Sequence, residues 1–299
     1  MTRRETRKGI RTNIRSGLFR RWNFAQQLKC EYIEVPADFA KSGKPLGKKA
    51  ILNLYEGEEE ALPEELKYIL HTEPVLRGHD VLKWYDKRWL DQFANMIIFL
   101  SESLGKPASI VEIHPGDRSK NFFEDIVRSI RFLLDKYSEA FGVEPLILLE
   151  NRTEQRISRG REIRDFWNFL SENHLDLKGK FGIVLDVQQL YTREGRDLEK
   201  KLKTIQLGIL HARFIKAFDI IPSEAIKGFH IHGSRRSGRS RRVHQVPRED
   251  GEVPWKVLFD RIKRLESHII INPEVLNEKW VEPTIEFCED LLSTQLSNL

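Results

Sequence analysis

The sequence contains little cysteine and no long apolar stretch. Its 299 residues include only two cysteines, too few for a disulfide framework or a cysteine-based zinc site. No uncharged apolar run approaches the roughly 20 residues that a membrane-spanning helix needs. The N-terminal segment MTRRETRKGIRTNIR is charged but has no apolar core like that of a signal peptide. These absences exclude an integral membrane protein and predict a cytoplasmic one.

The positive charge is concentrated in two segments. The formal net charge is +5, from 50 Lys and Arg against 45 Asp and Glu. Residues 1–21 have a balance of +7, and residues 234–248 contain six arginines and no acidic residue, so the other 263 residues carry −8. An acidic body with two cationic segments suggests a directed anionic partner such as a phosphate backbone. Either segment alone could equally be a solvated charged run.

Short apolar runs alternate with helical segments along the chain. Eight runs rich in Ile, Val and Leu are predicted to be buried strands, at residues 9–14, 31–36, 67–72, 109–115, 145–151, 181–187, 227–233 and 268–274. Segments with a 3.6-residue period lie between them, for example residues 122–137, closed by Gly142, and residues 83–104.

Eight strands at an average spacing of 37 residues, each followed by a helix, predict an α/β fold, the (β/α)8 TIM barrel. No low-complexity linker divides the chain, so residues 1–299 are predicted to form one domain. A doubly wound open sheet is the alternative. It is disfavoured because no Gly-rich phosphate turn follows any strand, which also argues against a nucleotide cofactor.

Ionisable side chains lie where the predicted strands end. They are His71, His114, Glu150, Asp186, His230 and, just after the last strand, Glu274. The carboxyl ends of barrel strands meet at one face, where barrel enzymes place their sites. Each residue alone could be a hydrogen-bonded structural histidine or a helix N-cap. Together they predict a metal centre, because buried ionisable groups are costly unless paired or metal-bound, and imidazoles mixed with carboxylates suit zinc, manganese or iron.

The motifs at these strand ends resemble those of a known enzyme family. His-Pro-Gly at 114–116, Glu-Asn at 150–151, Leu-Asp at 185–186 and Gly-Phe-His-Ile at 228–231 follow one another as in the endonuclease IV branch of the xylose-isomerase-like barrels. The resemblance spans roughly residues 9–290. Members of that branch use three zinc ions to cut the phosphodiester bond on the 5′ side of an abasic site. The resemblance therefore implies a DNA-repair endonuclease that prefers zinc.

Carried over position by position, the resemblance assigns the ligands. One ion would be held by His71, His114 and Glu150. A second would share Glu150, the predicted catalytic bridging ligand, with Asp186, His230 and Glu274. On the last strand the family's glutamate aligns with Asn272, and Glu274 reaches the same face by a two-residue offset.

The sequence departs from the family where the third ion would bind. Gln189 stands in place of a ligating histidine, and Arg241-Arg242-Val243-His244 stands in place of an Asp-x-His pair. We therefore predict about two divalent ions per chain. His244 and the additional His232 are candidates to replace part of the third ligand set.

Basic residues follow the first, second and seventh predicted strands, on the same face as the ligands. The predicted phosphate-binding residues are Arg15, Arg20, Arg21, Lys48, Lys49, Arg235, Arg236, Arg239, Arg241 and Arg242. With a metal pair they predict a monomeric phosphodiesterase acting on DNA at damaged or abasic sites. Two alternatives stay open on the same fold: a metal-dependent sugar isomerase or epimerase, and a barrel that binds nucleic acid without cutting it.

Overall fold

Most of the chain is described by the computed structural model. The described residues are 7–10, 24–38, 64–65, 67–73, 76, 82–199, 206–237, 240–265, 268–275 and 277–294. For residues 7–10, 235–237 and 240–242 only the backbone is described. The predicted phosphate-binding residues Arg15, Arg20, Arg21, Lys48, Lys49 and Arg239 lie outside the described residues.

Eight parallel strands close into a barrel in the order β1-β10-β7-β6-β5-β4-β3-β2. Their bounds are β1 Arg7–Ile10, β2 Tyr32–Ala37, β3 Lys67–Thr72, β4 Ile110–Ile113, β5 Leu146–Glu150, β6 Phe181–Asp186, β7 Ile226–Ile231 and β10 Ile270–Pro273. Each strand overlaps one of the eight predicted apolar runs, so the predicted TIM barrel is confirmed. The first run was placed too late, because β1 begins at Arg7 rather than residue 9.

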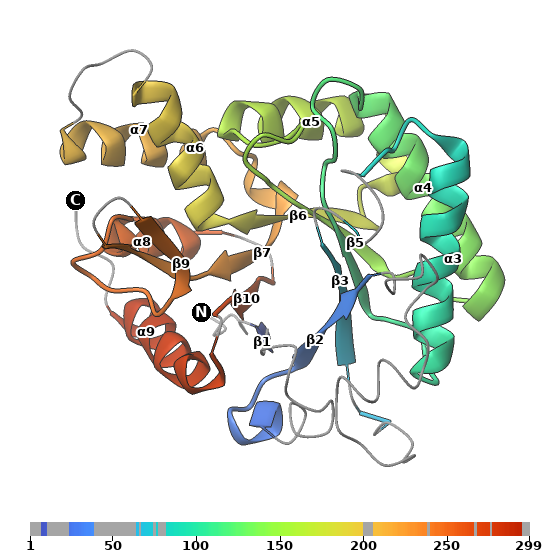
Figure 1. Cartoon of the computed structure of the whole chain (residues 1–299), viewed down its shortest axis with the longest axis horizontal. Coiled ribbons are helices and arrows are strands. Elements are labelled where there is room, and N and C mark those ends of the chain that lie inside the picture. Colours follow the sequence, from blue (N-terminus) through green and yellow to red (C-terminus); the bar gives the residue numbers. More distant parts are fainter. Residues whose placement is uncertain are drawn as a thin grey trace.

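Helices ring the outside of the barrel (Figure 1). They are α3 Lys87–Ser103, α4 Phe123–Phe141, α5 Gly160–Asn173, α6 Val187–Glu199, α7 Leu207–Asp219, α8 Trp255–Ile262 and α9 Val281–Ser293, with short 3-10 turns η1 Leu175–Leu177, η2 Ser223–Ala225 and η3 Glu278–Trp280. None of the helices in the described part of the chain combines the length and hydropathy of a membrane span.

Two helices show how local sequence sets their bounds. Helix α4 ends at Phe141, and Gly142 after it adopts the left-handed conformation with φ 69°. A glycine at this position predicts such a helix end. Helix α3 begins at Lys87, four residues later than the apolar period suggests. The reason is Asp86, whose carboxylate accepts hydrogen bonds from the backbone N–H groups of Arg88 and Trp89 and caps the helix there.

The barrel interior has an apolar floor below a polar layer. The floor is a cluster of buried side chains, Tyr32, Ile69, Ile110, Leu148, Val184 and Ile270. Side chains two residues further along a strand point to the same side. On those same strands the next inward positions are Glu34, His71, Glu112, Glu150, Asp186 and Asn272. All six are buried, so the strands change from apolar to polar side chains at one level of the barrel.

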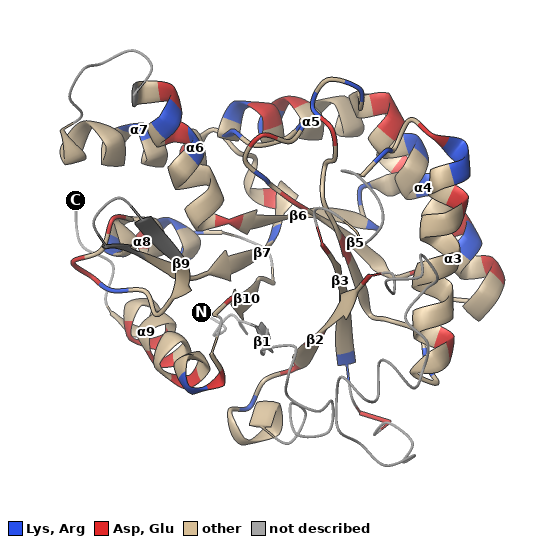
Figure 2. Cartoon of the chain, viewed as in Figure 1, with Lys and Arg blue, Asp and Glu red and all other residues tan. Residues whose placement is uncertain are grey.

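The arginine-rich segment after β7 forms a two-stranded antiparallel ribbon. Its strands are β8 Gly233–Ser237 and β9 Ser240–Gln245. We call residues 233–245 the arginine ribbon. The sequence predicted a loop here, because the segment has no apolar alternation that would mark a strand. Elsewhere in the described chain, charged residues lie mainly on the outer helices (Figure 2).

Candidate metal centre

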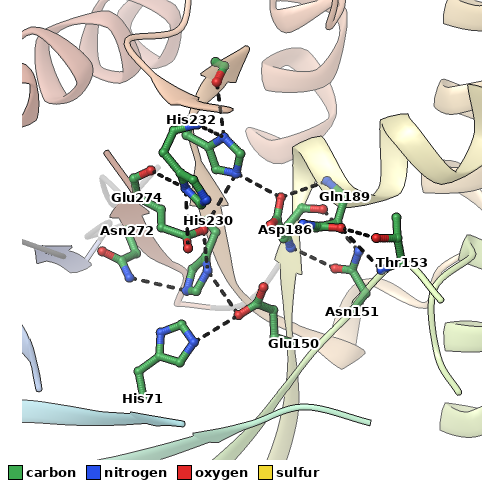
Figure 3. A network of polar contacts seen from close by, with 12 residues as sticks. His71, Glu150, Asn151, Thr153, Asp186, Gln189, His230, His232, Asn272 and Glu274 are labelled. Atoms are coloured by element: carbon green, nitrogen blue, oxygen red, sulfur yellow. Dashed lines mark hydrogen bonds and ion pairs between the residues drawn. The ribbon is translucent and has the colours of Figure 1, made fainter. Parts of the chain in front are cut away.

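The side chains of the polar layer converge at the carboxyl end of the barrel. Glu150 lies between residues of several strands, and dashed contacts join it to His71 and His230 (Figure 3). Within the described chain, the His and carboxylate side chains there form three groups, and in each group one ligand atom per residue lies within 4.8 Å of all the others.

The first group is His71, Glu112, Glu150 and His230. Nε2 of His71 and Nδ1 of His230 each lie 3.4 Å from Oε2 of Glu150. The other ring nitrogen of His230 lies 3.0 Å from Oε1 of Glu112. All four residues are at most 3% exposed. Two imidazoles and two carboxylates therefore lie together, buried from solvent.

The second and third groups continue from the first. Glu150 joins Asp186 and Glu274 in the second group, and Glu274 joins His232 and His244 in the third. Two carboxylates thus belong to two groups each. The three groups form a chain of potential ligand sets that starts at β3 and ends at the arginine ribbon.

The sequence-derived ligands are all brought together at this centre. Five of them belong to one or more groups: His71, Glu150, Asp186, His230 and Glu274. Glu274 reaches the centre from the position two residues beyond Asn272, as predicted. His114 lies beside them, with Nε2 3.8 Å from Oε2 of Glu150. The first group contains Glu112 where the sequence predicted His114.

Gln189 and Asn272 have other partners. The side-chain oxygen of Gln189 accepts a hydrogen bond of 2.7 Å from the Thr153 hydroxyl, and its backbone N–H donates to Asp186 Oδ1 at 2.9 Å. Asn272 donates to Glu34. In this structure Gln189 therefore holds Asp186 and Asn272 holds Glu34, and a direct part for either residue in metal binding stays a prediction.

Several buried polar atoms at the centre have no hydrogen-bond partner among the described residues. They are both carboxylate oxygens of Glu150, both ring nitrogens of His114, Nδ1 of His230, Nε2 of His232 and Oδ2 of Asp186. Leaving buried polar atoms unsatisfied is costly. A bound cation would satisfy carboxylate oxygens and imidazole lone pairs together, so the residues present fit divalent metal ions.

Burial and close charges set the protonation of these groups. Burial alone would raise the pKa of Glu150, but the imidazoles of His114, His230 and His71 hold it well below its usual range. Burial lowers the pKa of His114 to about 3, so its ring is neutral at pH 7. An ionised carboxylate and a neutral imidazole are the forms that bind metals.

The centre also holds opposite charges in contact. Burial alone would lower the pKa of His230, but the carboxylates of Glu112 and Glu150 raise it to about 9. For Glu112, burial raises the pKa despite its two histidine neighbours. Asp186 is equally buried, yet His232 lowers its pKa. The pKa of each of these groups is therefore set by several neighbours together and not by a single ion pair.

Sequence reasoning missed two carboxylates, Glu34 and Glu112. Glu34 lies inside the run EYIEVP, which also begins with Glu31, and Glu112 is the only carboxylate in the run SIVEIHP. Glu112 lies two residues before His114, so strand alternation already places both on one face. That alternation was the signal that could have found them.

Glu34 positions His71 instead of facing the ligand groups. Its carboxylate accepts a hydrogen bond of 2.6 Å from Nδ1 of His71, which leaves Nε2 directed at Glu150. A carboxylate on the far nitrogen fixes the tautomer and orientation of a metal-binding histidine. The same carboxylate accepts from Asn272, which also lies 3.3 Å from Nε2 of His230. Glu34 therefore connects the two histidines of the first group.

Replacing Glu34 with Gln is expected to weaken metal binding by about 10- to 100-fold, the usual effect of losing such a partner. The amide keeps the shape of the side chain but no longer stabilises the required tautomer of His71. Competition with a chromophoric chelator measures the affinity, and Glu31→Gln, at the half-buried start of the same segment where Glu31 pairs with Lys67, is the control. An unchanged affinity would show that Glu34 is only a packing residue.

The predicted phosphate-binding residues are placed only in part. The arginine ribbon includes four of them, Arg235, Arg236, Arg241 and Arg242. In its backbone register Arg235 is paired with Arg242, and Arg236 with Arg241. The ribbon follows β7 directly, on the face that holds the ligands. This part of the predicted cationic surface therefore begins beside the metal centre.

The fold and the site define a metal-binding TIM barrel. The chain belongs to the xylose isomerase-like TIM barrel family of enzymes, whose pattern matches residues 22–291. Similar solved structures include an IOLI protein with a bound zinc atom, at TM-score 0.59 and 12% identity, covering 98% of this chain and 100% of that one.

Proteins named for different activities share this likeness. A D-tagatose 3-epimerase-like protein matches at TM-score 0.58 and 14% identity, covering 96% of this chain and 97% of its own. A family 2 AP endonuclease from Brucella melitensis matches at TM-score 0.55 and 11% identity, covering 96% and 99%. At these identities the likeness establishes the fold, and the activity has to be argued from the site.

Proposed function

We propose that this chain is a metal-dependent phosphodiesterase that cleaves DNA at damaged or abasic sites, as in the endonuclease IV branch of its family. One observation carries the proposal: three ligand groups are linked through Glu150 and Glu274, and the arginine ribbon begins at the last of them. A multinuclear centre beside a cationic ribbon suits a phosphate backbone better than a small neutral sugar.

Glu150 and Asp186 have separate roles in this proposal. Divalent ions bound here would activate a water and stabilise the leaving oxygen of the phosphodiester. Glu150, shared by the first two groups, would hold a pair of ions together and need not act as a nucleophile. Asp186 is held for this role by the backbone N–H of Gln189. The backbone N–H of Asp186 itself donates to Asn151 Oδ1 at 2.8 Å, which fixes the end of β6.

The choice of zinc follows from the donor set. The first and third groups mix imidazoles with carboxylates, whereas magnesium and calcium prefer oxygen ligands alone. A zinc atom in the related IOLI protein supports the same ion. Zinc as the preferred ion, DNA as the partner and a monomeric state are predictions of this proposal.

A sugar epimerase is the second candidate, favoured by the epimerase-like protein among the similar structures. The second group, Glu150, Asp186 and Glu274, consists of carboxylates only. Such a group could hold one ion and move a proton at carbon. This function would leave the third ligand group and the arginine ribbon without a part in the reaction.

A substrate panel separates the two candidates. The protein, with zinc and with EDTA, is incubated with labelled duplex and single-stranded oligonucleotides carrying an abasic, deaminated or oxidised base, and separately with ketohexoses. We expect nicking of at least one lesion-bearing oligonucleotide that EDTA abolishes, and no epimerised sugar. Metal-dependent epimerisation without nicking would replace the proposed function with the alternative.

A further inference from the structure

The third ligand group lies at the base of the arginine ribbon. His232 directly precedes β8, His244 lies near the end of β9, and Glu274 follows β10 of the barrel. The two ends of the ribbon and the neighbouring barrel strand therefore each contribute one ligand. We propose that His232, His244 and Glu274 bind a zinc ion that fastens the base of the arginine ribbon to the barrel. We call this site the clasp.

The ligand atoms are close to the spacing that zinc requires. Nε2 of His232 lies 3.8 Å from Oε2 of Glu274, and Nδ1 of His244 lies 3.6 Å from Oε1. In a tetrahedral site with bonds of about 2.0–2.1 Å, ligand atoms are about 3.3 Å apart. One ligand atom from each of the three residues lies within 4.8 Å of the others, so they would draw closer together on binding zinc. The two rings already lie with centroids 4.3 Å apart and planes inclined by 32°.

The backbone of His244 directs its ring into the site. Its φ is 56°, in the left-handed region that residues with a side chain adopt at a cost. In this conformation the backbone N–H of His244 donates to Nδ1 of His232 at 3.2 Å. Nδ1 of the His244 ring lies 3.1 Å from the backbone oxygen of Glu274, and a zinc ion bound at Nδ1 would replace this contact. An unfavourable backbone conformation at a ligand position is typical of a functional site.

His232 directs Nε2 into the site. That nitrogen is buried and lies 3.4 Å from Oδ1 of Asp186 and 3.8 Å from Oε2 of Glu274. Its Nδ1 accepts the backbone N–H of His244, so binding zinc through Nε2 would move the ring proton to Nδ1 and break that hydrogen bond. The carbonyl oxygen of Gly233, 3.3 Å from Nδ1, can accept a hydrogen bond from it. Backbone carbonyls often take this part beside metal-bound histidines.

The ribbon has a physical need for such a fastening. Its register sets Arg235 opposite Arg242 and Arg236 opposite Arg241. A two-stranded ribbon alone is marginal in water. A zinc ion at its base would hold both strands in place. The inference rests on the proposed function, because the ribbon carries the arginines assigned to DNA.

Trypsin tests the clasp, because it cleaves after the arginines of the ribbon. EDTA-treated protein is digested with and without added zinc, and mass spectrometry follows cleavage after residues 235–242. If local opening releases the ion, cleavage in the ribbon should slow by about 100-fold at a zinc concentration of 100 times Kd. Magnesium should not protect, because it prefers octahedral oxygen ligands.

The deciding variant is His244→Asn. Asparagine tolerates positive φ, so the backbone conformation is preserved while the imidazole is removed. The variant should lose the zinc protection and bind one zinc ion fewer per chain than the parent. His174→Asn, on the opposite end of the barrel after α5, is the matched control and should behave as the parent. His232→Asn repeats the test if His244→Asn does not fold.

The outcomes separate the clasp from the catalytic proposal. Equal zinc protection in parent and His244→Asn would overturn the clasp, and so would an unchanged zinc content. Neither readout involves DNA. A protein that nicks lesion-bearing DNA but shows no clasp would overturn this inference alone. A protein with the clasp but without metal-dependent nicking would overturn the proposed function alone.

Discussion

A Glu150→Gln variant is expected to lose at least about 10³-fold in the rate of DNA cleavage while its affinity for DNA stays within about threefold of the parent. Glu150 is the carboxylate shared by the first two ligand groups, and both of its oxygens lack a hydrogen-bond partner within the described chain. The amide removes the charge that would hold two ions together. Metal ions supply several kcal/mol of transition-state stabilisation, at 1.36 kcal/mol per tenfold in rate.

Single-turnover cleavage and fluorescence anisotropy measure the two quantities separately. Glu139→Gln, an exposed substitution on α4, controls for the loss of one carboxylate and should leave both unchanged. Because the arginine ribbon is untouched, phosphate contacts should survive in the Glu150 variant. Cleavage at the parental rate would rule out a mechanism that depends on a shared glutamate ligand.

Replacing Arg235, Arg236, Arg239, Arg241 and Arg242 together by Ala should weaken DNA binding and flatten its salt dependence. On duplex DNA the slope of log affinity against log salt is about −0.9 per phosphate contact. Losing a few contacts flattens the slope by a few units, and three units correspond to about 10³-fold in affinity between 0.1 M and 1 M salt. The loss of affinity should be similar for all DNA sequences, because contacts to phosphates do not distinguish one base sequence from another.

The metal content of this variant should equal that of the parent, since His232, His244 and Glu274 are unchanged. The control replaces three cations at the opposite end of the barrel, Lys67, Arg131 and Lys180, whose partners are Glu31, Asp176 and Glu144. It should keep the parental salt slope. If the five-fold variant binds DNA with the parent's affinity and slope, the ribbon is not the DNA-binding element and the nuclease interpretation fails.

The last barrel strand illustrates where sequence reasoning reached its limit. The alternation of β10 places Asn272 and Glu274 on one face, so either could have been the ligand. The register pairs Asn272 with His230 in the polar layer, where it donates to Glu34. Glu274 lies one step higher and joins two ligand groups. The choice between them depended on contacts with β2 and the ribbon, which no local pattern contains.

The sequence by itself determined the eight strands, the helices between them and the ligand face, because strand and helix periods and residues at strand ends are local properties of the chain. Only the tertiary structure decided which side chains share a site. Closing the barrel placed Glu34 of β2 against His71 and Asn272, and Glu112 of β4 against His230. It also brought His244 back to His232 and Glu274 across the ribbon. These contacts depend on strand register and closure, which join residues far apart in sequence.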